Sequence, residues 1–99
     1  MAVIRGQSIT ITYTAWNFTT NLPATGDAGN HLLKLVKDGV EINASNSPNE
    51  VDSTYAPGEY NLVASGSEMD GRLITLTGKS STSGVYIIPV SLSTSPAVA

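Results

Sequence analysis

Apolar and polar residues alternate along much of this chain, most regularly over residues 8–16. One face of that segment carries Ile9, Ile11, Tyr13 and Ala15, and the other carries threonines at 10, 12 and 14. Alternation with a period of two predicts a β-strand that is buried on one face only. The same signal predicts further strands at residues 32–37, 40–44, 59–64, 72–78 and 85–94.

Turn-forming residues separate these predicted strands. Asp38-Gly39 is a strong signal for a two-residue hairpin of type I′. Segments rich in Asn, Ser, Thr, Gly or Pro are typical of loops, and they occur at residues 17–30, 44–57 and 79–84.

Residues 65–71 are the only segment with a helical signal, and they suffice for one turn. Ser65 or Ser67 can cap such a turn. Glu68 and Asp70 are interpreted as capping and solvation of the turn.

Short strands without a long helix predict an all-β fold. We expect an immunoglobulin-like antiparallel β-sandwich of about seven strands, including a short one near residues 2–5, with at most one short helical turn. The length predicts a single domain, residues 1–99. Its ends, residues 1–6 and 95–99, carry small apolar side chains and are expected to act as contact arms, with the interface candidates Val3, Ile4 and Val98.

The segment from Val85 to Leu92 differs from the other predicted strands because both of its faces are apolar. Pro89 has no backbone donor, which favours an edge strand or a bulge at that position. An apolar edge strand needs a partner to cover it, so Tyr86, Ile88 and Pro89 are further interface candidates. A strand buried in the centre of its sheet is the equal alternative.

Composition and charge argue against several classes of function. The net charge is −3, and the five Lys and Arg residues do not cluster, so nucleic-acid binding is not expected. No apolar run approaches the roughly 20 residues of a membrane-spanning helix, and the first residues lack the apolar stretch of a signal peptide. The absence of cysteine favours folding in a reducing cytoplasm.

Residues that carry chemistry are sparse. His31 is the only histidine and there is no cysteine, so a histidine-activated nucleophile would depend on this one residue. It follows a polar loop and is interpreted as a surface or rim residue. Glu50, Asp52 and Glu59 are interpreted as parts of a solvated turn rather than as a glycosidase-like carboxylate pair. We expect no enzymatic activity, no catalytic residue, no metal site and no cofactor.

Aromatic side chains are expected mainly in the core and at sheet edges. A sugar-stacking platform made by Trp16 and Tyr55 is the alternative, although nothing in the sequence places the two rings side by side.

Six motifs rich in turn residues stand out: Ala15-Trp16-Asn17-Phe18-Thr19-Thr20-Asn21, Thr25-Gly26-Asp27-Ala28-Gly29-Asn30-His31, Lys37-Asp38-Gly39, Asn46-Ser47-Pro48-Asn49-Glu50-Val51-Asp52, Ala56-Pro57-Gly58-Glu59-Tyr60 and Lys79-Ser80-Ser81-Thr82-Ser83. These motifs resemble a small domain that is widespread in the structural gene clusters of tailed bacteriophages. The resemblance spans about residues 7–94 and lies in turn residues and strand rhythm rather than in a catalytic signature. The chain departs from the family pattern at Asn17, where Asp is usual, and at residues 65–69, where a Thr-Ala-x-Glu-Met turn is usual.

This resemblance implies a virion structural protein with an immunoglobulin-like fold. A capsid decoration (cement) protein that stabilises the shell is the first expectation, and a tail, neck or baseplate component is a close second. An immunoglobulin-like module that binds a host glycan is the alternative from another class. The expected partners are the major capsid protein or other virion proteins, together with further copies in a symmetric array. The expected location is the virion, after synthesis in the host cytoplasm.

Overall fold

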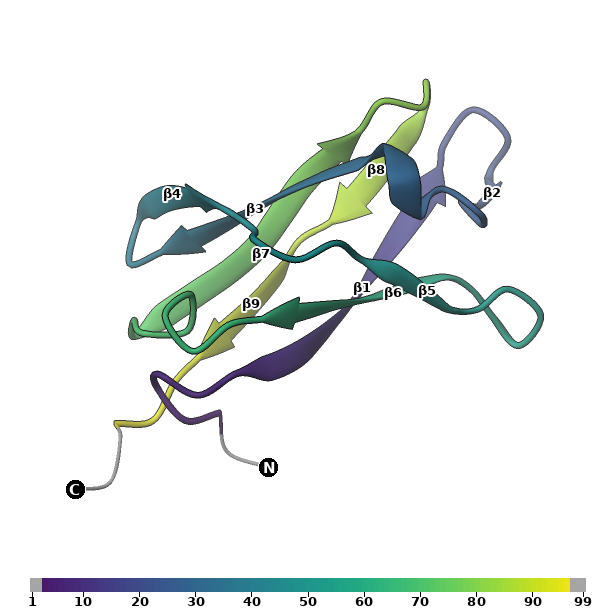
Figure 1. The fold of residues 1–99 in the computed structure, drawn as a ribbon. Helices are drawn as coiled ribbons and strands as arrows, with labels where there is room; N and C mark the ends of the chain where they lie inside the picture. Colours follow the sequence, from purple (N-terminus) through teal and green to yellow (C-terminus); the bar gives the residue numbers. More distant parts are fainter. Residues whose placement is uncertain (1–2, 97–99) are drawn as a thin grey trace.

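Two antiparallel β-sheets pack face to face in the computed structural model, which describes residues 3–96 (Figure 1). A 3-10 turn, η1 (Ala28–Asn30), leads into the second sheet. The first sheet contains β1 (Ile9–Asn17), β2 (Leu22–Pro23), β5 (Asn49–Asp52), β6 (Ala56–Ala64) and β8 (Val85–Ile88). The second contains β3 (His31–Lys37), β4 (Val40–Asn43), β7 (Leu73–Ser80) and β9 (Val90–Ser93).

The strand order confirms the predicted immunoglobulin-like sandwich. The first sheet runs β5-β6-β1 and the second runs β4-β3-β7-β9. These orders match strands D-E-B and C′-C-F-G of immunoglobulin domains. The sequence analysis predicted loops where two short strands, β2 and β5, are found. Each of these strands pairs for only a few residues at the edge of its sheet, which is too short to give a clear alternating pattern.

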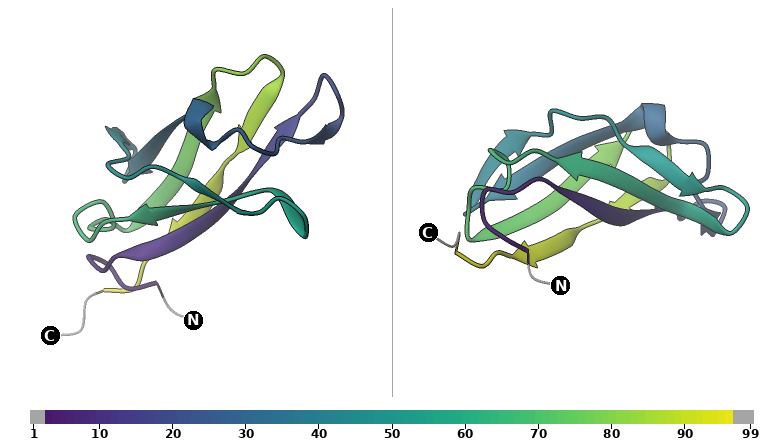
Figure 2. Two further views of the ribbon diagram at one scale, coloured as in Figure 1. Left: turned by 45° about the vertical axis from the view of Figure 1, so that its right-hand side comes forward. Right: turned by 60° about the horizontal axis from the view of Figure 1, so that its bottom comes forward.

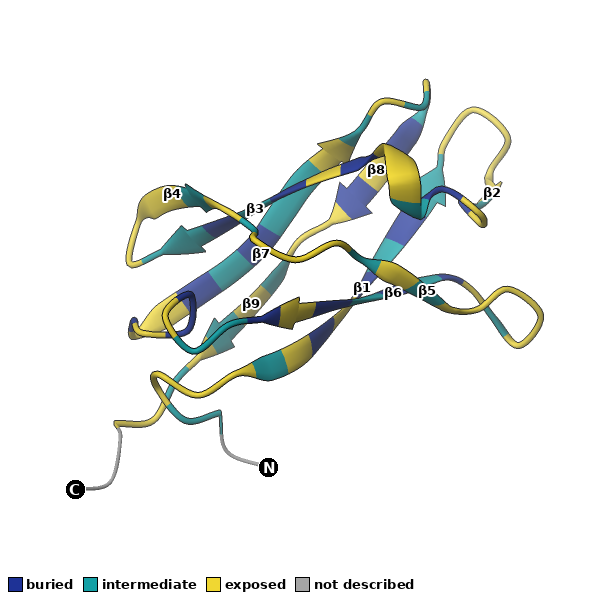
Figure 3. Cartoon of the chain, viewed as in Figure 1, coloured by how far each residue is buried: buried dark blue, intermediate teal, exposed yellow. Residues whose placement is uncertain are grey.

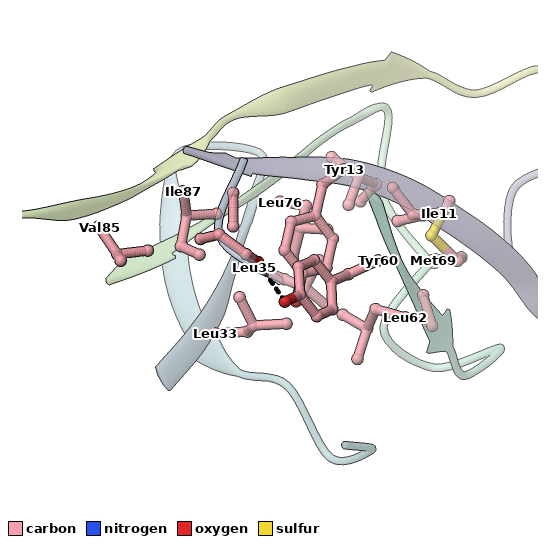
Figure 4. Packing of buried hydrophobic residues seen from close by; sticks show 14 residues of the cluster. Ile11, Tyr13, Leu33, Leu35, Tyr60, Leu62, Met69, Leu76, Val85 and Ile87 are labelled. Carbon is pink, nitrogen blue, oxygen red and sulfur yellow. Dashed lines mark hydrogen bonds between the residues drawn. The ribbon is translucent and has the colours of Figure 1, made fainter. Parts of the chain in front are cut away.

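The core is built from the alternating faces that the sequence predicts. On β1, Ile11, Tyr13 and Ala15 are buried, while the threonines between them face outward. Tyr13 is paired with Tyr60 of β6, and their rings stack with centroids 5.6 Å apart. Figure 4 shows the two rings at the centre of the cluster. The second sheet contributes buried residues that include Leu33, Leu35, Ile74 and Leu76.

The last predicted strand changes sheets at Pro89. β8 pairs with β1 in the first sheet, whereas β9 pairs with β7 in the second. Val85 and Ile87 face the core from β8, and Leu92 packs against the core from β9. Odd-numbered positions therefore face the core before the proline and even-numbered positions after it. This shift explains why a single sequence segment is apolar on both faces, and it rules out a centrally buried strand.

Pro89 is exposed at this crossover and interrupts the strand, as its missing donor favours. Figure 3 shows buried and exposed residues alternating along β8. The apolar residues that stay exposed on β8 are therefore Tyr86 and Ile88.

The two ends of the described chain pair with each other. Ile4 and Ser95 form a parallel β-bridge, and Ser95 N donates to Val3 O at 2.7 Å. Both views in Figure 2 place these segments at the same end of the sandwich. Val3 packs against the domain's own core, so part of the surface of its side chain is already buried within the domain.

The hairpin between β3 and β4 is the predicted type. Asp38 and Gly39 have φ values of 51° and 85°, and a type I′ turn requires positive φ at both central positions.

Candidate functional site

A buried polar network centred on Asp27 joins the loop before β3 to the end of β7. Asp27 is 7% exposed, and the donors to its carboxylate come from two segments of the chain, residues 30–31 and 80–82. Its carboxylate accepts hydrogen bonds from His31 Nε2 (3.1 Å), Ser80 Oγ (2.7 Å), Thr82 Oγ1 (2.6 Å) and Asn30 Nδ2 (3.0 Å).

The network continues through two tyrosines into the first sheet. His31 Nδ1 lies 2.7 Å from Tyr13 Oη, so neutral His31 accepts from Tyr13 while its Nε2–H donates to Asp27. Tyr60 Oη accepts from Asp27 N at 3.0 Å and donates to Ala24 O. The hydroxyls of the stacked tyrosines thus tie the loop before β3 to β1 and β6.

The ionisation states suit this hydrogen-bonding pattern. Burial lowers the pKa of His31 below its ordinary value by more than the nearby Asp27 raises it. Burial works to raise the pKa of Asp27, but hydrogen bonds from Thr82, Ser80 and Asn30 outweigh that effect, and the pKa is lowered. Asp27 is therefore ionised and His31 neutral at pH 7.

The sequence interpretation of His31 as a surface or rim residue is wrong. The residue is 7% exposed, and its side chain has no exposed surface. The signal that was missed is the alternation within β3. His31 lies on the same face of the strand as Leu33 and Leu35, which are buried.

The network has the residue types of a hydrolase triad but not the connections. A catalytic serine has to donate to the histidine, which acts as its base. Here Ser80 donates to Asp27 instead. His31 bonds on one side to Tyr13 and on the other to Asp27, so no nucleophile–base pair exists in this network. Its geometry fits a structural role, because the buried polar groups at its centre, on Asp27 and His31, have all found hydrogen-bond partners.

Glu50 was predicted to lie in a solvated turn, but the structure places it half-buried in β5. Its carboxylate accepts from Gly26 N (2.9 Å), Thr25 Oγ1 (3.1 Å) and Gly58 N (3.1 Å). Burial works to raise the pKa of Glu50, but the hydrogen bonds from Gly26 N, Gly58 N and Thr25 Oγ1 together outweigh it and lower the pKa. Glu50 thus fastens the loop before β3 to the start of β6.

Glu68 caps the turn after β6, as predicted. Ser65 N donates to Glu68 Oε1 at 2.8 Å, and Glu68 N donates back to Ser65 Oγ at 3.3 Å, which is a capping box. Ser45 N donates to the second carboxylate oxygen at 2.8 Å. Over residues 3–96, no three His, Cys, Asp or Glu residues gather in a way that could hold a metal ion.

The surface feature that stands out is an aromatic patch, defined here as Trp16, Phe18, Tyr86 and Ile88. Trp16 is paired with Tyr86 across β1 and β8, so both side chains lie on the outer face of the first sheet. The Phe18 and Tyr86 rings meet edge to face with centroids 5.4 Å apart. Phe18 is 58% exposed, Tyr86 63% and Ile88 42%.

The structure brings some of the interface candidates together and separates others. Tyr86, Ile88 and Pro89 are exposed on one short stretch. Val3 and Ile4 are half-buried at the paired chain ends, and Val98 lies outside the described residues. The sequence prediction missed Phe18, which directly follows β1 and lies beside the start of β8, where Phe18 N donates to Gly84 O at 2.8 Å.

Trp16 and Tyr55 are not in ring contact within residues 3–96. Tyr55 lies in the β5–β6 turn, and the ring pairs of the described chain do not include it.

Comparison with models of known protein families, with curated proteins and with solved structures finds no match for this chain. The helices of the described residues include none long and apolar enough to cross a membrane.

Proposed function

We propose that this protein is a non-enzymatic structural subunit of a bacteriophage virion, which decorates the capsid and stabilises it through protein–protein contacts. The observation that carries the proposal is the aromatic patch. Three of its side chains, Phe18, Tyr86 and Ile88, stay exposed although the domain has a core of its own, and contiguous exposed apolar residues are typical of surfaces that another subunit covers. The bacteriophage setting rests on the resemblance of the turn motifs.

The free energy available at the patch suits weak contacts that act in large numbers. An aromatic side chain can bury roughly 150–250 Å², so two rings more than half exposed offer on the order of 5 kcal/mol on burial. Part of this is lost to the entropy of association. A single contact of this size is modest, but repeated copies on a symmetric shell add their effects.

The Asp27 network supports this role from inside the domain. It connects both sheets through buried hydrogen bonds, which fix one arrangement of the core. A rigid subunit pays little ordering entropy when it binds, so more of the contact free energy goes into stabilising the assembly.

The test is the copy number of this chain in purified virions, measured by quantitative mass spectrometry against the major coat protein. Hundreds of copies, together with a lower melting temperature for particles made without the chain, would support decoration. A handful of copies would replace decoration with a neck or baseplate position. Absence of the chain from purified virions would overturn the proposal.

A further inference from the structure

The strands of the two sheets carry opposite charge. The charged residues of the first sheet are Glu50, Asp52 and Glu59, all acidic. Those of the second sheet are Lys34, Lys37, Lys79 and the single acid Glu41. A chain with a net charge of −3 therefore has one sheet that is wholly acidic and one in which lysine predominates.

The aromatic patch lies on the outer face of the acidic sheet. Cross-strand pairing places Thr14 beside both Glu59 on β6 and Ile88 on β8. Thr14 Oγ1 donates to Glu59 Oε2 at 2.9 Å, which holds that carboxylate one strand away from Ile88. The patch thus has an oriented negative charge at its border.

The outer face of the second sheet has a matching feature, which we term the lysine depression. It has a volume of about 540 Å³ and is lined by Leu32, Lys34, Glu41, Thr77, Gly78 and Lys79. Leu32 is 54% exposed. Pairing across β3 and β7 sets Lys79 directly beside Leu32, and Thr77 beside Lys34. The depression therefore combines an apolar side chain with two cationic ones and one acid, Glu41, so its charge is positive overall.

We propose that the aromatic patch of one copy binds the lysine depression of a second copy, so that subunits associate head to tail. In that arrangement Tyr86 or Phe18 contacts Leu32, the lysines lie against an aromatic ring, and Glu59 faces a lysine. Contact between two first sheets would instead bring acids against acids, and contact between two second sheets would bring lysines against lysines. Charge complementarity thus selects the unlike pair.

The dimensions allow a stable contact of this kind. The domain measures 48 × 27 × 18 Å, so its broad face exceeds the ~800 Å² that each partner contributes to a standard interface. Two different surfaces on each subunit give a heterologous contact, which propagates into a ring or an open chain. This inference rests on the proposed function, because it names the further copies that such a subunit would bind.

The first test is sedimentation velocity of the purified protein across a concentration series at low and high salt. We expect reversible, concentration-dependent association that weakens several-fold when salt screens the charges. Tyr86→Ser and the double variant Lys34→Glu/Lys79→Glu should each lower the association constant at least tenfold, as expected for residues central to an interface. Tyr55→Ser is the matched control: Tyr55 is 89% exposed but lies in the β5–β6 turn, and its loss should leave association unchanged.

The sharper test is to mix the two defective variants. Each keeps one intact surface, so an equimolar mixture should form a heterodimer that grows no further, while each variant alone stays monomeric. Circular dichroism and melting temperature confirm that both variants are folded. The head-to-tail contact is overturned if the wild type stays monomeric at low salt, if Tyr55→Ser weakens association as much as Tyr86→Ser, or if the mixture stays monomeric.

This outcome can be separated from that of the virion test. A monomeric protein present in virions at high copy number would remove the head-to-tail contact and leave the structural role standing. A protein that self-associates but is absent from virions would remove the proposed structural role and leave the head-to-tail contact standing.

Discussion

Asp27→Ala should destabilise the domain far more than removal of any exposed acid. The substitution deletes the one acceptor shared by His31, Ser80, Thr82 and Asn30. A buried donor that loses its acceptor costs about 1–3 kcal/mol, because no water replaces the lost bond.

The size of the effect follows from how buried each donor is. The His31 side chain has no exposed surface, so its Nε2–H bears the full cost of about 1–3 kcal/mol. The Ser80 and Thr82 hydroxyls are only half-buried and can rotate toward water, at roughly 0.5–1 kcal/mol each. The free energy of unfolding should therefore fall by about 2–5 kcal/mol, which lowers Tm by roughly 10–40 °C in a domain of this size.

Urea unfolding followed by the fluorescence of Trp16, the only tryptophan, measures this change directly. Asp52→Ala is the control, because Asp52 is exposed and bonds only to Thr54 N and Tyr55 N. It should cost less than about 1 kcal/mol. If Asp27→Ala stays within that same range, the network does not stabilise the fold and the reasoning fails.

Two further predictions concern pH and a glycine. Burial lowers the pKa of His31 in the folded state, so as the pH falls the unfolded chain binds a proton at this residue before the folded chain does. The contribution of His31 to stability is therefore complete above about pH 6.5 and decreases below it. Unfolding free energies should thus fall between pH 7 and pH 5 in the wild type and change less in His31→Gln; a rise in wild-type stability toward pH 5 would contradict this. Gly58→Ala should cost roughly 2 kcal/mol or more, because Gly58 has φ +80° and a Cβ there would lie 2.8 Å from Pro23 Cβ. Gly39→Ala, at φ +85° with open space around it, isolates the backbone strain in the same thermal melts, and equal losses in the two variants would show that the close approach to Pro23 costs nothing.

Most of the fold could be predicted from local sequence because its signals are local. The alternation in β1 and β6 and the Asp38-Gly39 turn depend on neighbouring residues, and the structure follows them closely. The crossover at Pro89 could not be predicted, since alternation describes which face is apolar and says nothing about which sheet supplies the hydrogen-bonding partner.

The Asp27 network could not be predicted either, because local sequence patterns carry no information about contacts between distant segments. Ser80 and Thr82 meet Asp27 across more than fifty positions of sequence, and only the tertiary fold creates that contact. The aromatic patch was predicted in part: Tyr86 and Ile88 stand out as apolar strand residues, but Phe18 meets Tyr86 only because β1 pairs with β8, which no local pattern shows.

The pairing of β1 with β8 also constrains how the chain folds during synthesis. Residues Thr14 to Asn17 leave the ribosome well before Val85–Ile88, their partners. Until then the β1 edge has no β8 beside it, and an unpaired edge of this kind can capture other chains. Pairings this distant in sequence also slow folding. Closure of the sandwich therefore waits for β8, so nascent chains crowded on one polysome face a higher risk of mispairing than folded ones.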